Sequence, residues 1–274
     1  MDSSTEALGE IEAVATRAAL DSGELLLSYL GRLDPARMGR KSSARDLVTE
    51  ADVASERVLV ERLRASFPSH SIQAEEEVRD AADPTRPRWY LDPLDGTVNF
   101  VHGLPAFCVS MGLFLGKEAL VGIVHAPVLG ETFVAHRGGG THVIDRAGRR
   151  TPCRVRPTTS LGEAVVATGF PYRRNELSNN NLANFNAVYP RVRGIRRFGA
   201  APLDLAWVAA GRLDAFWEQH LGAHDVAAGI VLVREAGGVV RDLDGGDDQL
   251  ESGHIVAGSK PLVDELASCV SSTG

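Results

Sequence analysis

Two aspartates three positions apart, Asp92 and Asp95, could together bind a metal ion. They lie in the segment DPLDGT, directly after the apolar residues WYL of an expected strand. Pro93 favours an extended or turn conformation at Asp92, and Gly96 permits a tight bend. Carboxylates brought together there repel each other unless a cation lies between them. Magnesium prefers oxygen ligands and is usually held by one or two carboxylates plus substrate phosphate, so it would remove that repulsion.

Acidic residues elsewhere in the chain could join this pair. The run AEEE, which contains Glu75, follows an apolar strand pattern, Asp52 lies in DLVTEAD, and Asp225 starts the Ala-rich helical pattern HDVAAG. Each also has a simpler explanation: a solvated acidic run, a helix cap, and a favourable charge at a helix N-terminus. DPLDGT alone is equally explained as an aspartate-capped turn. Residue spacing by itself leaves these alternatives open.

The composition is that of a globular protein and disfavours several function classes. The 274 residues include 29 Lys and Arg against 36 Asp and Glu, a formal charge of −7, so general nucleic-acid binding is not expected. The best apolar run, 105–115, is shorter than the roughly 18 residues that a membrane-spanning helix needs. The N-terminus is acidic and lacks an apolar segment, which predicts no secretory signal and a cytoplasmic protein. Three widely spaced cysteines predict no disulfide framework.

The elements that must position the acids follow from hydrophobic periodicity. Apolar residues at helical spacing over 11–25 predict a long first helix, and the Gly-, Ser- and basic-rich segment 31–45 predicts a mobile loop. A second helix is predicted to start at about Thr49, where Thr49 and Asp52 form a capping signal, and to run to the next proline. Short apolar runs then predict strands of one sheet, antiparallel where the links are short: SIQAEEE, RWYLDPLDGT, FCVSMGLFLG, ALVGIVHAP and ETFVAHR.

The rhythm changes in the second part of the chain. Strands and helices alternate there: EAVVATGF, helix 179–188, GIRRF, helix 201–210, RLDAFWE, helix 225–236 and GGVVRDL. Such alternation is typical of an α/β arrangement. We therefore expect two parts. Residues 1–155 would hold the N-terminal helices and a mainly antiparallel sheet with most metal ligands, and residues 156–274 would supply Asp225 and substrate contacts.

Five segments together resemble the inositol monophosphatase family, specifically its bacterial inositol-1-monophosphatase-like branch. They are DLVTEAD, AEEE, WYLDPLDGTVNFVHG, GAAPLDLAWVAAGRLDAFWE and HDVAAGIVLVREAGGVV, in the family's order and spacing. The resemblance implies a layered αβαβα sandwich of the inositol monophosphatase and fructose-1,6-bisphosphatase type, within the α+β or α/β class. It also implies a magnesium-dependent, lithium-sensitive phosphatase that is commonly a homodimer.

The resemblance also implies a set of metal ligands. A first metal would be held by Glu75, Asp92 and the backbone carbonyl of Leu94. A second would be held by Asp92, Asp95 and Asp225, and a weaker third would depend on Glu75 and water. Two or three Mg²⁺ ions per active site are therefore expected.

The remaining roles concern the water and the substrate. Thr97, assisted by Asp52, would orient the attacking water, and the backbone N–H groups of Gly96 and Thr97 would hold the phosphate, beside Asp95. Glu218 would contact a substrate hydroxyl, and Ala201 would line the same pocket. Lys41 would lie on a mobile loop near the metals.

Two positions depart from the family's usual pattern. Trp usually precedes the last metal-binding aspartate, and this chain has His224 there; Gly usually stands two positions after Glu218, and this chain has His220. Each histidine is either tolerated variation or a substrate contact that changes the preferred leaving group. His224 is therefore counted among the candidate substrate-binding residues.

The expected activity is hydrolysis of a small phosphate monoester by metal-activated water. Two metals about 3.5–4 Å apart activate the water and stabilise the leaving oxygen, so no covalent nucleophile is needed. Accordingly, the chain contains neither a G-x-S-x-G nor a G-x-x-x-x-G-K-[ST] motif. Myo-inositol 1-phosphate is the first candidate substrate. Histidinol phosphate, fructose 1,6-bisphosphate and 3′-phosphoadenosine 5′-phosphate are alternatives, as is a regulatory scaffold that binds a protein or RNA partner.

Overall fold

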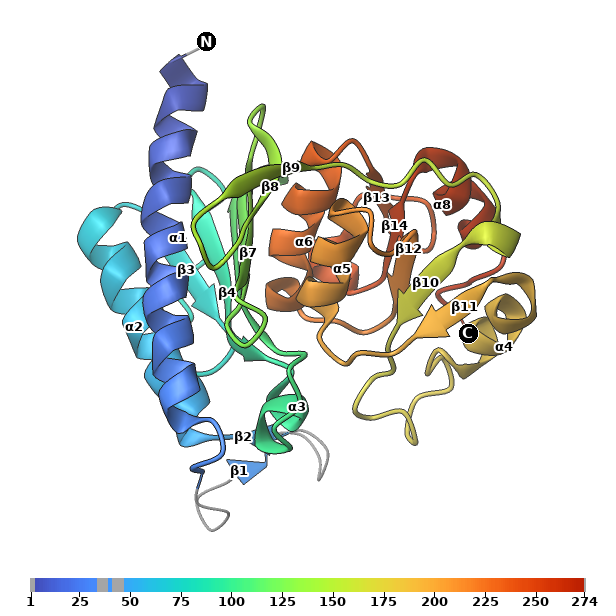
Figure 1. Ribbon diagram of the computed structural model, residues 1–274, viewed down its shortest axis with the longest axis horizontal. Helices are drawn as coiled ribbons and strands as arrows, with labels where there is room; N and C mark the ends of the chain where they lie inside the picture. The colour runs from blue at the N-terminus through green and yellow to red at the C-terminus, as the bar shows by residue number, and fades with distance from the viewer. Residues whose placement is uncertain (1–2, 34–38, 41–46, 274) are drawn as a thin grey trace.

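Two β-sheets alternate with three layers of helices, in the order helix, sheet, helix, sheet, helix (Figure 1). The computed structural model describes residues 3–33, 39–40 and 47–273. α1 (Ser3–Tyr29) and α2 (Glu50–Ser66) form the first layer, α5 (Ala201–Ala209) and α6 (Ala223–Glu235) the middle one, and α4 (Leu182–Val188) and α8 (Lys260–Ala267) the last. This arrangement confirms the predicted αβαβα sandwich. Among the described helices, none is long and apolar enough to cross a membrane.

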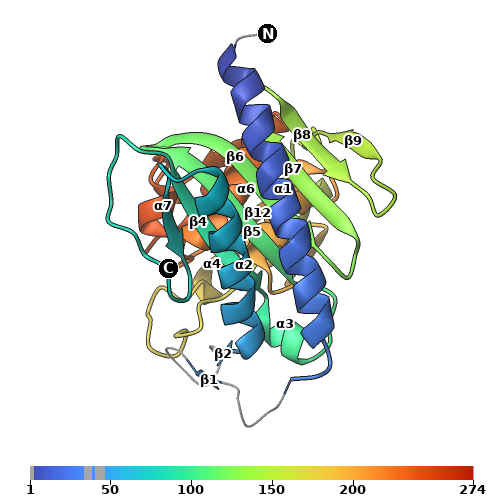
Figure 2. The same ribbon diagram turned by 90° about the vertical axis from the view of Figure 1, so that its left-hand side faces the viewer.

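The larger sheet has seven strands that follow one another in chain order. They are β3 (Ser71–Ala74), β4 (Arg88–Asp95), β5 (Cys108–Leu115), β6 (Glu118–Ala126), β7 (Glu131–His136), β8 (Gly140–Ile144) and β9 (Arg150–Cys153). Only β3 and β4 pair in parallel; the other neighbours are antiparallel. The hydrophobic pattern does not predict β8 and β9, because most of their residues are exposed or half-buried. α1 and α2 cover one face of this sheet (Figure 2).

The smaller sheet has the strand order β11-β10-β12-β14-β13. Its strands are β10 (Val165–Thr168), β11 (Gly194–Arg196), β12 (Ala215–Glu218), β13 (Val239–Arg241) and β14 (Ile255–Gly258). β10 is parallel to both neighbours, and β14 is antiparallel to both of its own. α4 begins at Leu182, three residues later than predicted, because Asn181 has φ 70° and its side-chain amide donates hydrogen bonds to Thr168 and Gly169.

Short elements complete the described chain. β1 (Gly39–Arg40) pairs with β2 (Leu47–Val48), and α3 (Thr97–Val101), α7 (Gln249–Ser252) and the 3₁₀ turns Leu161–Glu163 and Tyr189–Arg191 lie between longer elements. The predicted mobile loop 31–45 is described only in part, and Lys41 lies outside the described residues. The proposed division between residues 155 and 156 falls in the segment that joins β9 to β10. It remains a proposal.

A pair of glycines allows α6 to lie very close to the larger sheet. Gly112 of β5 and Gly122 of β6 are directly opposite each other across the two strands. A Cβ atom added at Gly112 would lie 2.5 Å from the Cβ of Ala227, and one added at Gly122 would lie 2.6 Å from the carbonyl oxygen of Ala228. Both distances are shorter than van der Waals contact. The glycines therefore set the position of α6, whose first turn carries Asp225.

Gly112→Ala is expected to lower the free energy of unfolding by about 1–3 kcal/mol, because the new methyl group overpacks against the helix backbone. A displaced α6 should also weaken the stabilisation that added Mg²⁺ gives, since Asp225 would move. Urea unfolding with and without Mg²⁺ measures both effects. Gly246→Ala is the control, because a Cβ there meets nothing within 4 Å. Equal stability of the Gly112→Ala protein and the wild type would show that the close approach is not required.

Candidate metal centre

Carboxylates from separate segments meet in one pocket near the end of β4. Glu75 directly follows β3, Asp92 and Asp95 lie in the last part of β4, and Asp225 lies in the first turn of α6. Glu218, the last residue of β12, lines the same pocket. The fold thus brings together acids that are up to 150 positions apart in the sequence, from Glu75 to Asp225.

The donor atoms form two overlapping groups. Glu75, Asp92 and His224 make one group, and Asp92, Asp95 and Asp225 make the other. Within each group, one donor atom from each residue lies within 4.8 Å of the others. Asp92 belongs to both groups and is only 2% exposed. A carboxylate shared in this way suits a pair of neighbouring cations.

The backbone between Asp92 and Asp95 departs from the regular β-ladder, which explains how both carboxylates reach one site. The pairing of β4 with β5 shifts register between these two residues, and the backbone N–H of Leu94 donates a hydrogen bond to Asp92 Oδ1 (3.0 Å). The strand continues through this irregularity to Asp95. Gly96 then has φ 84°, and a Cβ there would lie 2.8 Å from the carbonyl oxygen of Ala106. Glycine is therefore required at this bend.

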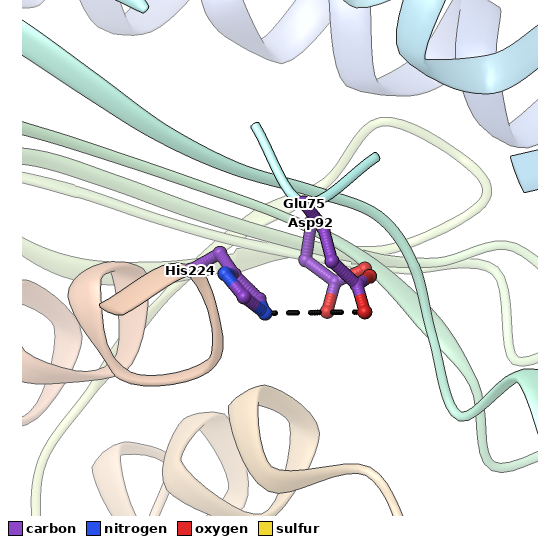
Figure 3. A group of neighbouring side chains, drawn as sticks. All are labelled: Glu75, Asp92 and His224. Atoms are coloured by element: carbon purple, nitrogen blue, oxygen red, sulfur yellow. Dashed lines mark ion pairs between the residues drawn. The ribbon is translucent and has the colours of Figure 1, made fainter. Parts of the chain in front are cut away.

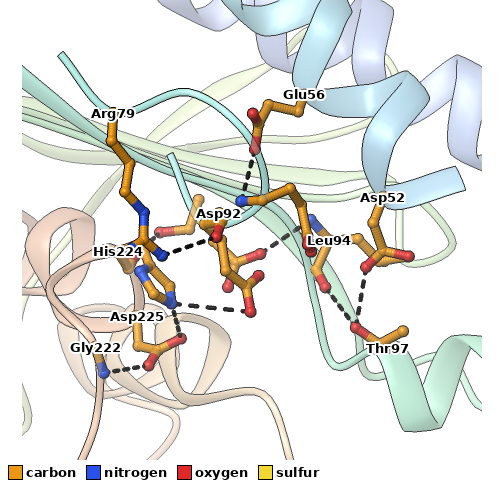
Figure 4. A network of polar contacts seen from close by, with 12 residues as sticks. Asp52, Glu56, Arg79, Asp92, Leu94, Thr97, Gly222, His224 and Asp225 are labelled. Atoms are coloured by element: carbon orange, nitrogen blue, oxygen red, sulfur yellow. Dashed lines mark hydrogen bonds and ion pairs between the residues drawn. The ribbon is translucent and has the colours of Figure 1, made fainter. Parts of the chain in front are cut away.

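Asp52 caps α2 and also contacts Thr97. Its Oδ2 accepts hydrogen bonds from the backbone N–H (2.8 Å) and the hydroxyl (2.6 Å) of Thr49, which completes the predicted cap of α2. Its Oδ1 lies 3.2 Å from the Thr97 hydroxyl (Figure 4). That hydroxyl also lies 3.1 Å from the carbonyl oxygen of Leu94. It has one proton, so with two acceptors in reach its oxygen lone pairs stay available to accept a hydrogen bond.

Glu56, which the sequence analysis did not single out, holds the segment that carries Glu75. Its buried carboxylate accepts hydrogen bonds from the backbone N–H groups of Glu76 (2.8 Å), Glu77 (2.9 Å) and Val78 (2.8 Å). Three such bonds fix the turn after β3. The sequence feature that could have identified Glu56 is its position as a charged residue on the apolar face of the predicted second helix.

The electrostatics of the centre fit a divalent cation. Burial raises the pKa of Asp95 well above its ordinary value, and the nearby Asp225 and Glu75 carboxylates raise it further. Burial likewise raises the pKa of Asp225, an effect that His224 opposes and Glu75 reinforces. Without a counter-charge, these groups disfavour each other's ionised form. A divalent cation between them would offset both the burial and the repulsion, and carboxylate oxygens are suitable ligands for it.

A second buried acid, Asp204, was missed by the sequence analysis. It lies in the first turn of α5, lines the pocket and is 2% exposed. Among the described residues, its Oδ1 has no hydrogen-bond partner. Burial raises its pKa well above the ordinary value, Glu218 adds to this, and Arg197 opposes it. The signal was an aspartate inside the apolar helical run PLDLAWVAA, since buried aspartates are rare.

Burial raises the pKa of Glu218 to about 8, against the opposing charge of Arg197. In metal-free protein, Glu218 therefore binds a proton on folding between pH 4.5 and about 8, and the free energy of unfolding falls as pH rises through this window. Glu218→Gln is expected to remove this loss and to raise stability above pH 8 by on the order of 2 kcal/mol. It should have little effect near pH 5. Urea unfolding in EDTA across this range measures the difference; a pH-independent effect would contradict the assignment.

Comparisons with known proteins identify the family of this chain. The model of the inositol monophosphatase family matches residues 7–273. The chain belongs to the inositol monophosphatase family. It is 45% identical over 250 residues to the Nus factor SuhB of Pseudomonas aeruginosa, covering 90% of each chain. It is 37% identical over 257 residues to the inositol-1-monophosphatase of Mesorhizobium japonicum, covering 94% of each.

Solved structures of the family share the fold. The inositol monophosphatase from Anabaena matches with a TM-score of 0.85 and 38% identity, over 96% of this chain and 95% of that one. SuhB from Mycobacterium tuberculosis matches with a TM-score of 0.78 and 32% identity, over 95% of each chain. These similarities extend over both sheets and the helical layers.

The other positions singled out through the family resemblance lie at the same pocket, except Lys41, which is outside the described residues. Leu94, Gly96, Thr97, Ala201 and His224 line it, whereas Asp52 reaches it through Thr97. His220 also lines the pocket and has φ 61°, a left-handed conformation that favours the glycine usual in the family. Its Nε2 lies 3.0 Å from the backbone carbonyl oxygen of Asn179. His220 therefore has a protein partner at the pocket rim.

Proposed function

We propose that this member of the inositol monophosphatase family hydrolyses a small phosphate monoester with the help of bound divalent cations. The observation that supports this most strongly is the pair of ligand groups that share Asp92. A relative named inositol-1-monophosphatase, 37% identical over nearly the full length, makes myo-inositol 1-phosphate the first candidate substrate. Histidinol phosphate, fructose 1,6-bisphosphate and 3′-phosphoadenosine 5′-phosphate are the alternatives.

In the proposed site, Glu75, Asp92 and the carbonyl of Leu94 would hold one cation, and Asp92, Asp95 and Asp225 would hold another. Glu75 would also support a weaker third. Cations bound there would lower the pKa of a coordinated water and neutralise charge on the phosphate and the leaving oxygen. The described residues fit these roles because their oxygens converge from separate segments onto one pocket.

The protein's own contribution is to orient the reactants. The Thr97 hydroxyl, donating its proton to Asp52 or to Leu94, can accept a hydrogen bond from the attacking water and fix its direction. The backbone N–H groups of Gly96 and Thr97 are proposed to bind phosphate oxygens. Ala201 and Glu218 line the part of the pocket proposed for the alcohol portion of the substrate. The Glu218 carboxyl group can form a hydrogen bond with a substrate hydroxyl.

The test is phosphate release from a panel of polyol, sugar, amino-alcohol and nucleotide phosphates, with Mg²⁺ and with EDTA. Mg²⁺-dependent release, abolished by Asp95→Asn, is the expected result. The substrate with the highest kcat/KM identifies the substrate class. Absence of release from every compound would overturn the proposal. The family resemblance further predicts inhibition by lithium in the same assay and a homodimer in sedimentation analysis.

A second candidate function is regulatory binding of a protein or RNA partner. The relative that is 45% identical carries the name Nus factor SuhB, which supports this alternative. The formal charge of −7 favours a protein partner over RNA. Co-purification of partners with the wild-type chain and with Asp95→Asn separates the two functions. A partner retained by the inactive variant would support a binding role independent of hydrolysis.

A further inference from the structure

The imidazole of His224 points into the metal centre. Its Nε2 lies 4.0 Å from Glu75 Oε1 and 3.7 Å from Asp225 Oδ1. Figure 3 shows the ring beside the carboxylates of Glu75 and Asp92, and the three residues form one of the two ligand groups. The side chain is 19% exposed, so the ring is largely shielded by protein.

Hydrogen bonds hold the backbone turn that carries this ring, and a glycine leaves room for it. The hydroxyl of Ser110 in β5 donates a hydrogen bond to the backbone carbonyl of His224 (3.2 Å), which ties the start of α6 to the larger sheet. Gly222 provides the space for the ring, because a Cβ there would lie 2.4 Å from the imidazole Cε1. The Gly222 N–H donates a hydrogen bond to Asp225 Oδ2 (2.6 Å) and caps the same turn. These bonds fix the backbone turn that carries the ring.

The distances are close to those of a coordination sphere. Two donors at about 2.1 Å from a common ion lie about 3.0–3.4 Å apart when they are adjacent and about 4.2 Å apart when they are opposite. The 4.0 Å between His224 Nε2 and Glu75 Oε1 lies between these two values, nearer to that of opposite donors. A tryptophan, which the family usually has here, offers no lone pair to a metal.

We propose that His224 is a metal ligand, so that Glu75, Asp92 and His224 form a mixed nitrogen and oxygen site selective for a first-row transition-metal dication such as Mn²⁺, Co²⁺ or Zn²⁺. Imidazole favours these ions, whereas Mg²⁺ prefers oxygen ligands. The neighbouring group of Asp92, Asp95 and Asp225 has only oxygen donors and suits Mg²⁺. The centre would then hold two different metals. This inference rests on the proposed metal centre and deepens it.

Metal binding itself provides the test. Metal-free protein is titrated separately with Co²⁺ and Mg²⁺ by calorimetry, and the Co²⁺ form is examined by visible absorption and by proton NMR. We expect a hyperfine-shifted imidazole N–H resonance in the wild type. His224→Trp should remove it and weaken Co²⁺ binding at least about 10-fold, while Mg²⁺ affinity changes less than about 3-fold. His224→Gln should change the Co²⁺ and Mg²⁺ affinities in the same way, which shows that the effect does not come from the bulk of the Trp side chain.

His220→Gly is the matched control. It removes the other histidine that lines this pocket, in a backbone conformation that glycine adopts readily, and both affinities should stay unchanged. Equal weakening of Co²⁺ and Mg²⁺ by both His224 variants, or unchanged Co²⁺ binding without a shifted imidazole resonance, would overturn the proposal. Because no substrate is present, this result is independent of the phosphatase assay. If no compound of the panel releases phosphate but His224 still binds Co²⁺, the proposed function is wrong and the role of His224 as a ligand stands.

Discussion

Asp95→Asn is expected to lower the rate of phosphate release on the order of 10³-fold and, in metal-free protein, to raise stability. Activity falls because Asp95 contributes one of the charges that bind the second proposed cation. Stability rises because burial and the neighbouring carboxylates of Asp225 and Glu75, which raise the pKa of Asp95, act against its ionised form. A neutral amide of nearly the same size removes that repulsion. Catalysis and stability should therefore change in opposite directions.

Initial rates at saturating Mg²⁺ and urea unfolding in EDTA measure the two effects. Added Mg²⁺ should stabilise the wild type and leave the variant almost unchanged, since a ligand stabilises only the state that binds it. Asp244→Asn is the matched control, because Asp244 is exposed and lies outside the pocket. If the variant keeps wild-type activity and still gains stability from Mg²⁺, Asp95 is not a metal ligand.

Thr97→Ala is expected to lower kcat between about 10²-fold and 10⁴-fold while metal binding is retained. The hydroxyl is held 3.2 Å from Asp52 and 3.1 Å from the carbonyl oxygen of Leu94, and it belongs to neither ligand group. Removing it should leave the attacking water bound but poorly oriented. Thr97→Ser, which keeps the hydroxyl, should recover most of the rate. Steady-state kinetics together with calorimetric Mg²⁺ titration separate the two effects.

Thr49→Ala distinguishes the two roles of Asp52. It removes the hydroxyl that bonds to Asp52 Oδ2 in the cap of α2 and leaves the contact between Asp52 Oδ1 and Thr97 intact. A loss of about 0.5–2 kcal/mol in stability with a nearly unchanged kcat is expected. If Thr49→Ala reduced kcat as strongly as Thr97→Ala, the effect of Thr97 would reflect general disorder of this region, and its proposed role would fail.

The sequence by itself determined the local features of this protein. The cap at Thr49 and Asp52, the bend at Gly96 and most of the strands of the larger sheet follow from interactions between residues close in the chain, where backbone preference and hydrophobic alternation act directly. The resemblance to the family also identified the acids that meet at the pocket, apart from Asp204. Strands β8 and β9 were not predicted, because most of their residues are exposed or half-buried and their sequences therefore lack an alternation of apolar and polar residues.

Only the tertiary structure decided which side chains share one environment. It placed His224 Nε2 4.0 Å from Glu75 Oε1. It also buried Asp204 with no hydrogen-bond partner for its Oδ1 among the described residues, and it brought the positive charge of Arg197 close enough to Glu218 to oppose the rise that burial causes in the pKa of that carboxyl group. The first of these relations depends on how close α6 lies to the larger sheet, which the opposed Gly112 and Gly122 permit. Charge interactions and metal coordination change over a few ångströms, whereas sequence patterns indicate elements and not the distances between them.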